Sequence, residues 1–132
     1  MKNIIKLFIL PLLLLNVVFA HCQIPCGIYD DVLRFVSMEE DIATIQKSIN
    51  KIQELGDSEN SIQNQNQLVR WVNNKESHAQ KIQNVISEYF LAQRIKPKNV
   101  GDNGYDKYVM LSTSCQKIIF YAMKCKQNVD TQ

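Results

Sequence analysis

One short stretch of the sequence gathers residues that could bind a metal ion. It places an imidazole, two thiols and, three residues later, a tyrosine in the order His21-Cys22-Gln23-Ile24-Pro25-Cys26-Gly27-Ile28-Tyr29. Three interpretations fit such a cysteine pair: a structural disulfide, a redox-active dithiol, or a metal site that uses both thiolates with the histidine. The C-x-x-x-C spacing and the lack of a β/α pattern around it disfavour a thioredoxin-like dithiol.

The residues before His21 have the layout of a secretory signal peptide. Lys2 and Lys6 precede an apolar run over residues 7–19, and Ala20 supplies the small residue of a cleavage site. The run is shorter than the roughly 20 apolar residues of a membrane-spanning helix, and it contains a proline. We therefore predict a signal peptide over residues 1–20, cleavage after Ala20, and a periplasmic or secreted protein. His21 then becomes the N-terminus, and its α-amine becomes a further metal ligand.

The charge balance argues against two classes of partner. The chain of 132 residues has 15 basic and 13 acidic residues. Removal of residues 1–20 takes away two lysines and no acid, which leaves 13 of each sign. Nucleic-acid-binding proteins usually show a basic excess, and membrane-surface helices show a lysine-rich face. We expect no nucleic-acid partner and, after cleavage, no membrane partner.

Three segments show apolar residues at alternating steps of three and four, the pattern of a helix with one buried face. The stripes are Phe35, Met38, Ile42, Ile45, Ile49, Ile52; then Leu68, Val72, Ala79, Ile82, Ile86, Tyr89; then Tyr108, Leu111, Cys115, Ile118, Ala122, Cys125. They predict helices over residues 31–55, from about 68 to 94, and over 105–126. The short connections between them favour antiparallel neighbours, so we predict one all-α, up-down bundle domain over residues 30–132.

The two distal cysteines share one predicted helix. Cys115 and Cys125 are ten residues apart, or some 15 Å at about 1.5 Å per residue. A disulfide requires Cα atoms within roughly 7 Å. We therefore expect two buried core residues and no bond between them.

The donors near the predicted N-terminus narrow the choice of metal. Thiolates, an imidazole and an amine suit zinc, copper or nickel. If the backbone amide of Cys22 also binds, the amine, the amide and two thiolates form a planar N2S2 set. That set favours nickel(II) or copper(II) over tetrahedral zinc.

The complete motif, H-C-Q-I-P-C-G-I-Y at a processed terminus, resembles the nickel hook of the nickel-containing superoxide dismutases, H-C-x-x-P-C-G-x-Y. Every fixed position is matched, by His21, Cys22, Pro25, Cys26, Gly27 and Tyr29. The segment Ser87-Glu88-Tyr89-Phe90 also looks like the second helix of that family. We refer to residues 21–29 as the hook.

The resemblance implies a superoxide dismutase with one nickel ion per subunit. The ligands it implies are the α-amine and imidazole of His21, the amide nitrogen and thiolate of Cys22, and the thiolate of Cys26. Tyr29 would stand at the open face of the metal, where superoxide is the substrate. The implied chemistry is Ni(II)/Ni(III) cycling, and the implied assembly is a homohexamer of four-helix bundles.

The sequence departs from the family in the residues that support the histidine. The family uses a glutamate and an arginine there. This chain has Met38 at the glutamate position, beside Glu39 and Glu40, and its comparable stretch of the second helix reads Asn74-Lys75. Glu76 or a neighbouring subunit is the remaining candidate for holding the imidazole.

The number of helices is a second departure, because only three can be identified where the family has four. A bundle that lacks one helix exposes an apolar stripe, which another subunit could cover. Two alternatives to the enzyme stay open at this point. One is a non-catalytic helical protein that binds nickel or copper, and the other is a helical module with a structural Cys22–Cys26 disulfide.

Overall fold

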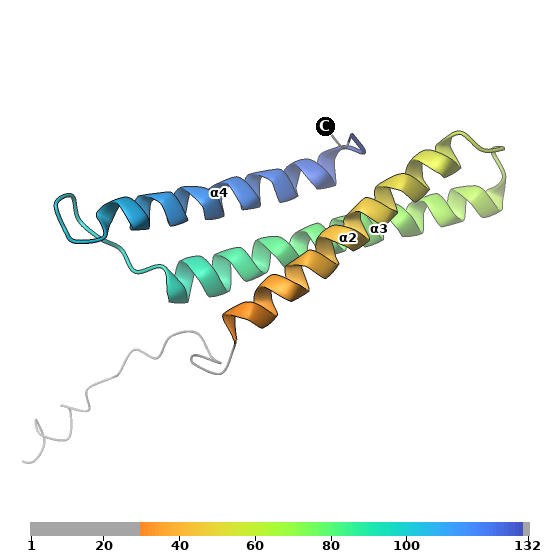
Figure 1. The fold of residues 1–132 in the computed structure, drawn as a ribbon. Helices are drawn as coiled ribbons and strands as arrows, with labels where there is room; N and C mark the ends of the chain where they lie inside the picture. The colour runs from red at the N-terminus through yellow and green to blue at the C-terminus, as the bar shows by residue number, and fades with distance from the viewer. Residues whose placement is uncertain (1–29, 131–132) are drawn as a thin grey trace, which may run out of the picture.

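The computed structural model describes residues 30–130, which form three helical rods and no strand (Figure 1). The helices are α2 (Asp31–Gly56), α3 (Ile62–Asn84), the π-helix η1 (Val85–Arg94) and α4 (Tyr105–Gln127). α3 continues directly into η1, so the two make one rod. The predicted all-α fold is confirmed. Over residues 30–130, no helix has the length and apolar character needed to span a membrane.

Side-chain caps mark where the first two helices begin. The Asp30 carboxylate accepts a hydrogen bond from the Val32 amide at 2.7 Å, and the Ser61 hydroxyl accepts one from the Asn64 amide at 3.1 Å. α3 therefore begins at Ile62, well before the predicted start near Leu68. The predicted start was too late because the first turns of α3 are mostly polar and exposed to solvent. These turns therefore lack the periodic apolar residues on which the prediction relied.

The central rod of α3 and η1 supplies the surface on which α2 and α4 pack (Figure 1). The buried apolar cluster draws on all three rods: Met38, Ile45, Ile49, Ala79, Ile82, Ile86, Cys115 and Ala122. Cys115 is buried as predicted, whereas Cys125 is only half-buried. Both are free thiols, which confirms that they do not pair.

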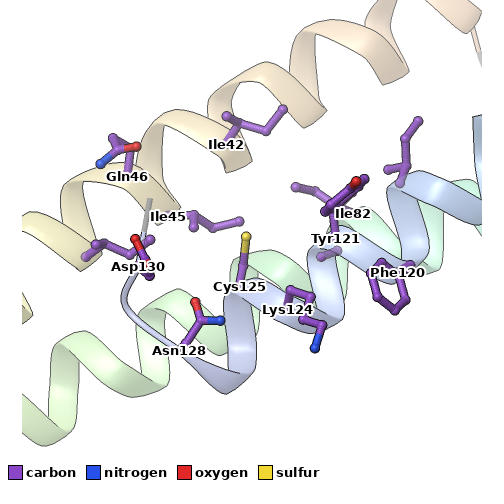
Figure 2. Close-up of a pocket in the computed structure, with 13 residues that line it drawn as sticks. Ile42, Ile45, Gln46, Ile82, Phe120, Tyr121, Lys124, Cys125, Asn128 and Asp130 are labelled. Carbon is purple, nitrogen blue, oxygen red and sulfur yellow. The ribbon is translucent and has the colours of Figure 1, made fainter. Parts of the chain in front are cut away.

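Part of each predicted stripe is not buried. Phe35 and Ile42 of α2 are 52% and 58% exposed, and Leu111 and Ile118 of α4 are also exposed. Two of these four residues, Ile42 and Ile118, line a groove of about 690 Å³ between α2 and α4, with Ile82 of α3 at its floor. Figure 2 shows Ile42 and Ile45 on one side of this groove, and Tyr121 and Cys125 on the other. Within residues 30–130 no further helix fills that space.

A buried lysine fixes the end of α4. The Lys75 ammonium, from α3, donates to the carbonyl oxygens of Cys125, Lys126 and Asn128 at 2.7, 2.9 and 2.8 Å. These carbonyls are among those that a helix C-terminus leaves unpaired, and the negative end of the helix dipole favours a cation there. Burial lowers the pKa of Lys75, partly offset by Glu76. The lysine thus joins the middle of α3 to the end of α4.

Candidate functional site

The predicted ligands His21, Cys22 and Cys26, together with Tyr29, lie outside the described residues. The described chain begins at Asp30, the residue after Tyr29. The structure therefore describes the part of the chain that follows the hook in sequence and the helix that packs beside it. These are the first turn of α2 and the end of η1, which lie beside each other in Figure 1.

A carboxylate in the first turn of α2 joins the two elements. The Tyr89 hydroxyl donates to Oδ1 of Asp31, and Arg94 Nη2 donates to Oδ2 at 2.6 Å. The Arg94 guanidinium also lies over the Tyr89 ring, 5.7 Å from its centroid. Both oxygens of Asp31 are thus used by one neighbouring helix. We call Asp31, Tyr89 and Arg94 the anchor cluster.

The π-helical register explains how both partners reach the same carboxylate. Tyr89 and Arg94 are five residues apart, and in an α-helix that spacing turns a side chain about 140° away from the first. In η1 the backbone pairs at i→i+5, as the bond from the Ile95 amide to the Phe90 carbonyl shows at 2.9 Å. The wider turn brings residues five apart closer to one face. π-helical turns are frequent at functional sites.

The hydrogen bonds of the anchor cluster shift the pKa values of Asp31 and Tyr89 in opposite directions. The hydrogen bond from Arg94 lowers the pKa of Asp31, and the bond from Tyr89 lowers it further. The same contact raises the pKa of Tyr89, because the phenol donates its proton to a carboxylate. Asp31 is therefore held as an anion and Tyr89 as a neutral donor.

Aromatic rings pack beside the anchor cluster. The Phe35 ring of α2 lies 5.0 Å from the Phe90 ring of η1, and Phe90 lies 5.1 Å edge-on from Tyr89. Tyr89 itself is buried. The start of α2 thus contacts η1 through apolar rings as well as through the Asp31–Arg94 ion pair.

The residues considered as supports for the histidine have other positions and partners. Met38 is buried in the core, whereas Glu39, Glu40 and Glu76 are exposed. The Asn74 amide donates to the Ser48 hydroxyl at 3.0 Å. Lys75 caps α4. Asn74 and Lys75 thus make structural contacts between helices.

A second polar pair lies deeper between α2 and α3. His78 Nδ1 is 2.6 Å from Asp41 Oδ1, and the Lys81 ammonium is 4.0 Å from the same atom. Asp41 is buried, so the pair supplies the partner that its carboxylate needs. Residues 30–130 contain no group of three or more histidine, cysteine or acidic side chains that could hold a metal.

Comparison with known families identifies the class of enzyme to which the chain belongs. Residues 16–132 match the family model of the nickel-containing superoxide dismutases, so the chain belongs to that family. Searches of curated proteins and of solved structures gave no significant match. The protein is accordingly a superoxide dismutase, an oxidoreductase that acts on superoxide and contains nickel.

The anchor cluster was not predicted from the sequence as a unit. Asp31 was assigned to the start of a helix, Tyr89 to a buried stripe, and Arg94 to a helix end. Each assignment is correct, but none of them reveals the contact. Tyr89 and Arg94 lie 58 and 63 residues from Asp31, and no local pattern links positions so far apart.

Proposed function

We propose that this chain converts two superoxide anions and two protons into dioxygen and hydrogen peroxide at a nickel ion held by the hook. The ligands are the α-amine and imidazole of His21, the amide and thiolate of Cys22, and the thiolate of Cys26. The observation that carries the proposal is the extent of the family match, which spans residues 16–132 and so includes the whole hook.

The donors of the hook suit this metal. Two thiolates with nitrogen donors suit nickel(II) as well as copper(II). When bound, nickel would supply an electron relay between Ni(II) and Ni(III), accepting an electron from one superoxide and returning it to another. The thiolates and the anionic amide are strong donors, which would favour the higher oxidation state, and the His21 imidazole would supply a further nitrogen donor.

Tyr29 completes the proposed site. Its phenol can donate an O–H hydrogen bond. Placed at the open face of the metal, it would orient a small anion by a hydrogen bond. Asp30, the next residue, has an extended backbone conformation and caps the N-terminus of α2. The helix therefore begins two residues after Tyr29.

Export and processing are part of the proposal. Cleavage after Ala20 would create the α-amine that the ligand set requires and would release a periplasmic or secreted protein. Support comes from the basic, apolar and small residues of segment 1–20. The intact mass of the purified protein tests this directly, because it must correspond to a chain that begins at His21.

The decisive experiment adds one glycine before His21. The extended chain keeps every side chain of the hook but moves the terminal amine. We expect it to lose nickel and superoxide turnover, while its far-ultraviolet circular dichroism stays unchanged. Turnover that survives the extension would overturn the proposed ligand set.

Cysteine variants give a matched comparison. Cys22→Ser and Cys26→Ser each remove a thiolate donor, so both should abolish turnover. Cys125→Ser makes the same chemical change at a half-buried thiol of α4 and should keep it. His21→Gln retains the amine, so it should bind nickel and turn over poorly. Nickel content and superoxide consumption measure each outcome.

We also propose a homohexamer. The resemblance to the family implies it, and the open apolar groove between α2 and α4 supports the idea that a second copy of this chain covers that surface. Size-exclusion chromatography with light scattering measures the assembly. A stable monomer would contradict this part of the proposal.

A further inference from the structure

The structure carries an inference about how the hook is held in place, and it rests on the function proposed above. The hook ends at Tyr29, and Asp31 follows two positions later. Two residues of chain span at most about 7 Å. A fixed Asp31 would therefore limit how far away Tyr29 can lie.

Two hydrogen bonds from η1 hold the Asp31 carboxylate. Its two carboxylate oxygens take separate donors, the Tyr89 hydroxyl and the Arg94 guanidinium, and both donors belong to η1. Hydrogen bonds to an ionised carboxylate are stronger than those between neutral groups. Asp30 does a different task, because its carboxylate turns back to the Val32 amide within α2.

We propose that Asp31 is a positioning residue of the nickel site. Bound by Tyr89 and Arg94, its carboxylate holds the first turn of α2 against η1 and thereby sets where the end of the hook joins the helices. Asp31 contacts neither the metal nor superoxide in this scheme. It acts through the two peptide units that connect it to Tyr29.

The anchor cluster connects the start of α2 to the rest of the bundle through η1. η1 is continuous with α3 and packs against α4, so a contact to η1 ties the hook to the central rod. The start of α2 also contacts η1 through the Phe35 and Phe90 rings, and Phe35 is itself half exposed. Loss of the carboxylate should therefore loosen the hook without unfolding the bundle.

The test uses processed, nickel-loaded protein that begins at His21. Asp31→Asn removes the charge at nearly constant shape, and Arg94→Gln removes the other partner. We expect either variant to release nickel to excess EDTA roughly 10-fold faster than wild type, the lower end of the usual effect of a residue that supports metal ligands. The thiolate-to-nickel absorption bands should shift as well. The double variant should add little to either single one, because the two residues act as one contact.

Glu54→Gln is the matched control. It makes the same carboxylate-to-amide change in an ion pair of α2, Lys51–Glu54 at 2.6 Å, at the far end of the helix. This control should release nickel at the wild-type rate, and Asp31→Glu, which restores the carboxylate, should recover most of the retention. Thermal unfolding of the metal-free variants shows that the bundle is intact in each.

The outcomes separate the inference from the function on which it rests. Wild-type protein that retains nickel, together with Asp31→Asn that releases it no faster than Glu54→Gln, overturns the positioning role alone. Wild-type protein that retains no nickel at the hook overturns both.

Discussion

At the scale of single residues, three aspartates of one segment have three separate roles. Asp30 caps α2, Asp31 binds Tyr89 and Arg94, and Asp41 lies buried against His78. The first two are neighbours in sequence, yet one faces back along its own helix and the other faces η1. Their chemistry is set by the direction each side chain takes from the helix start.

The pH dependence of stability should identify the contribution of Asp31. Hydrogen bonds from Arg94 and Tyr89 lower its pKa in the folded protein below the ordinary value of 3.8. The folded carboxyl therefore binds a proton less tightly than the unfolded one. Its stabilisation is complete above about pH 5 and is lost as the pH falls through the folded pKa.

Urea unfolding of wild type and Asp31→Asn at pH 7, 5 and 3 measures this effect. The difference in the free energy of unfolding should be equal at pH 7 and 5, and smaller at pH 3. A difference that persists unchanged at pH 3 would show that the carboxylate charge is not what stabilises the contact.

Removing the charge of buried Asp41, which contacts His78, should lower the stability of the protein. Asp41→Asn keeps the size of the side chain and removes the charge that faces His78 at 2.6 Å and Lys81 at 4.0 Å. We expect the free energy of unfolding to fall by about 1.5–3 kcal/mol, the usual value of a hydrogen bond to a charged group. Glu40→Gln, at the exposed neighbouring position, should change it by less than about 0.5 kcal/mol. Equal effects from the two variants would contradict the assigned role.

How far these residues could be predicted depended on their separation in the chain. The proposed ligands His21, Cys22 and Cys26 lie within one short motif, so a metal site could be considered beside a disulfide and a dithiol, and the resemblance to the family motif then implied nickel. The anchor cluster joins α2 to η1 across about half of the chain. Its formation depends on how two helices pack, and a single sequence carries no local signal for that.

At the scale of elements, periodicity located the helices well and described their geometry less well. The predicted bounds of α2 and α4 each fall within a residue of the observed ones. The polar start of α3 was missed because exposed turns need no apolar stripe. The change from α-helix to π-helix after Asn84 was also missed, since the apolar spacing runs through it without a break.

Lys75 should prove important for the attachment of α4. Lys75→Met keeps the apolar stem but leaves three carbonyl oxygens at the end of α4 without their ammonium donor. We expect a loss of about 1–3 kcal/mol in the free energy of unfolding. Hydrogen exchange should also speed up in the last turn of α4 more than in α2.

The control for this prediction is Lys47→Met, at an exposed position of α2. It removes a lysine of the same kind from solvent and should leave both measurements close to wild type. Similar protection of α4 in the two variants would show that the Lys75 ammonium does not hold the helix end.

At the scale of the whole molecule, the described helices leave one side unfilled. α2 and α4 both pack on the central rod, but between them lies the groove lined by apolar side chains. Periodicity predicted that these faces would be apolar and could not say what covers them. The proposed homohexamer offers one occupant for this groove, a second copy of the chain.

A charged residue in this groove should therefore separate assembly from folding. Ile42 is 58% exposed, so Ile42→Lys costs the single chain little, but it would bury a charge if a second copy packs there. We expect light scattering to show smaller assemblies for this variant, with unchanged helix content. Val69→Lys places the same charge at an equally exposed apolar position of α3, 59% exposed and outside the groove, and should assemble as wild type. If Ile42→Lys and Val69→Lys both keep the wild-type mass, the subunits meet through some other surface and the groove faces solvent in the assembled enzyme.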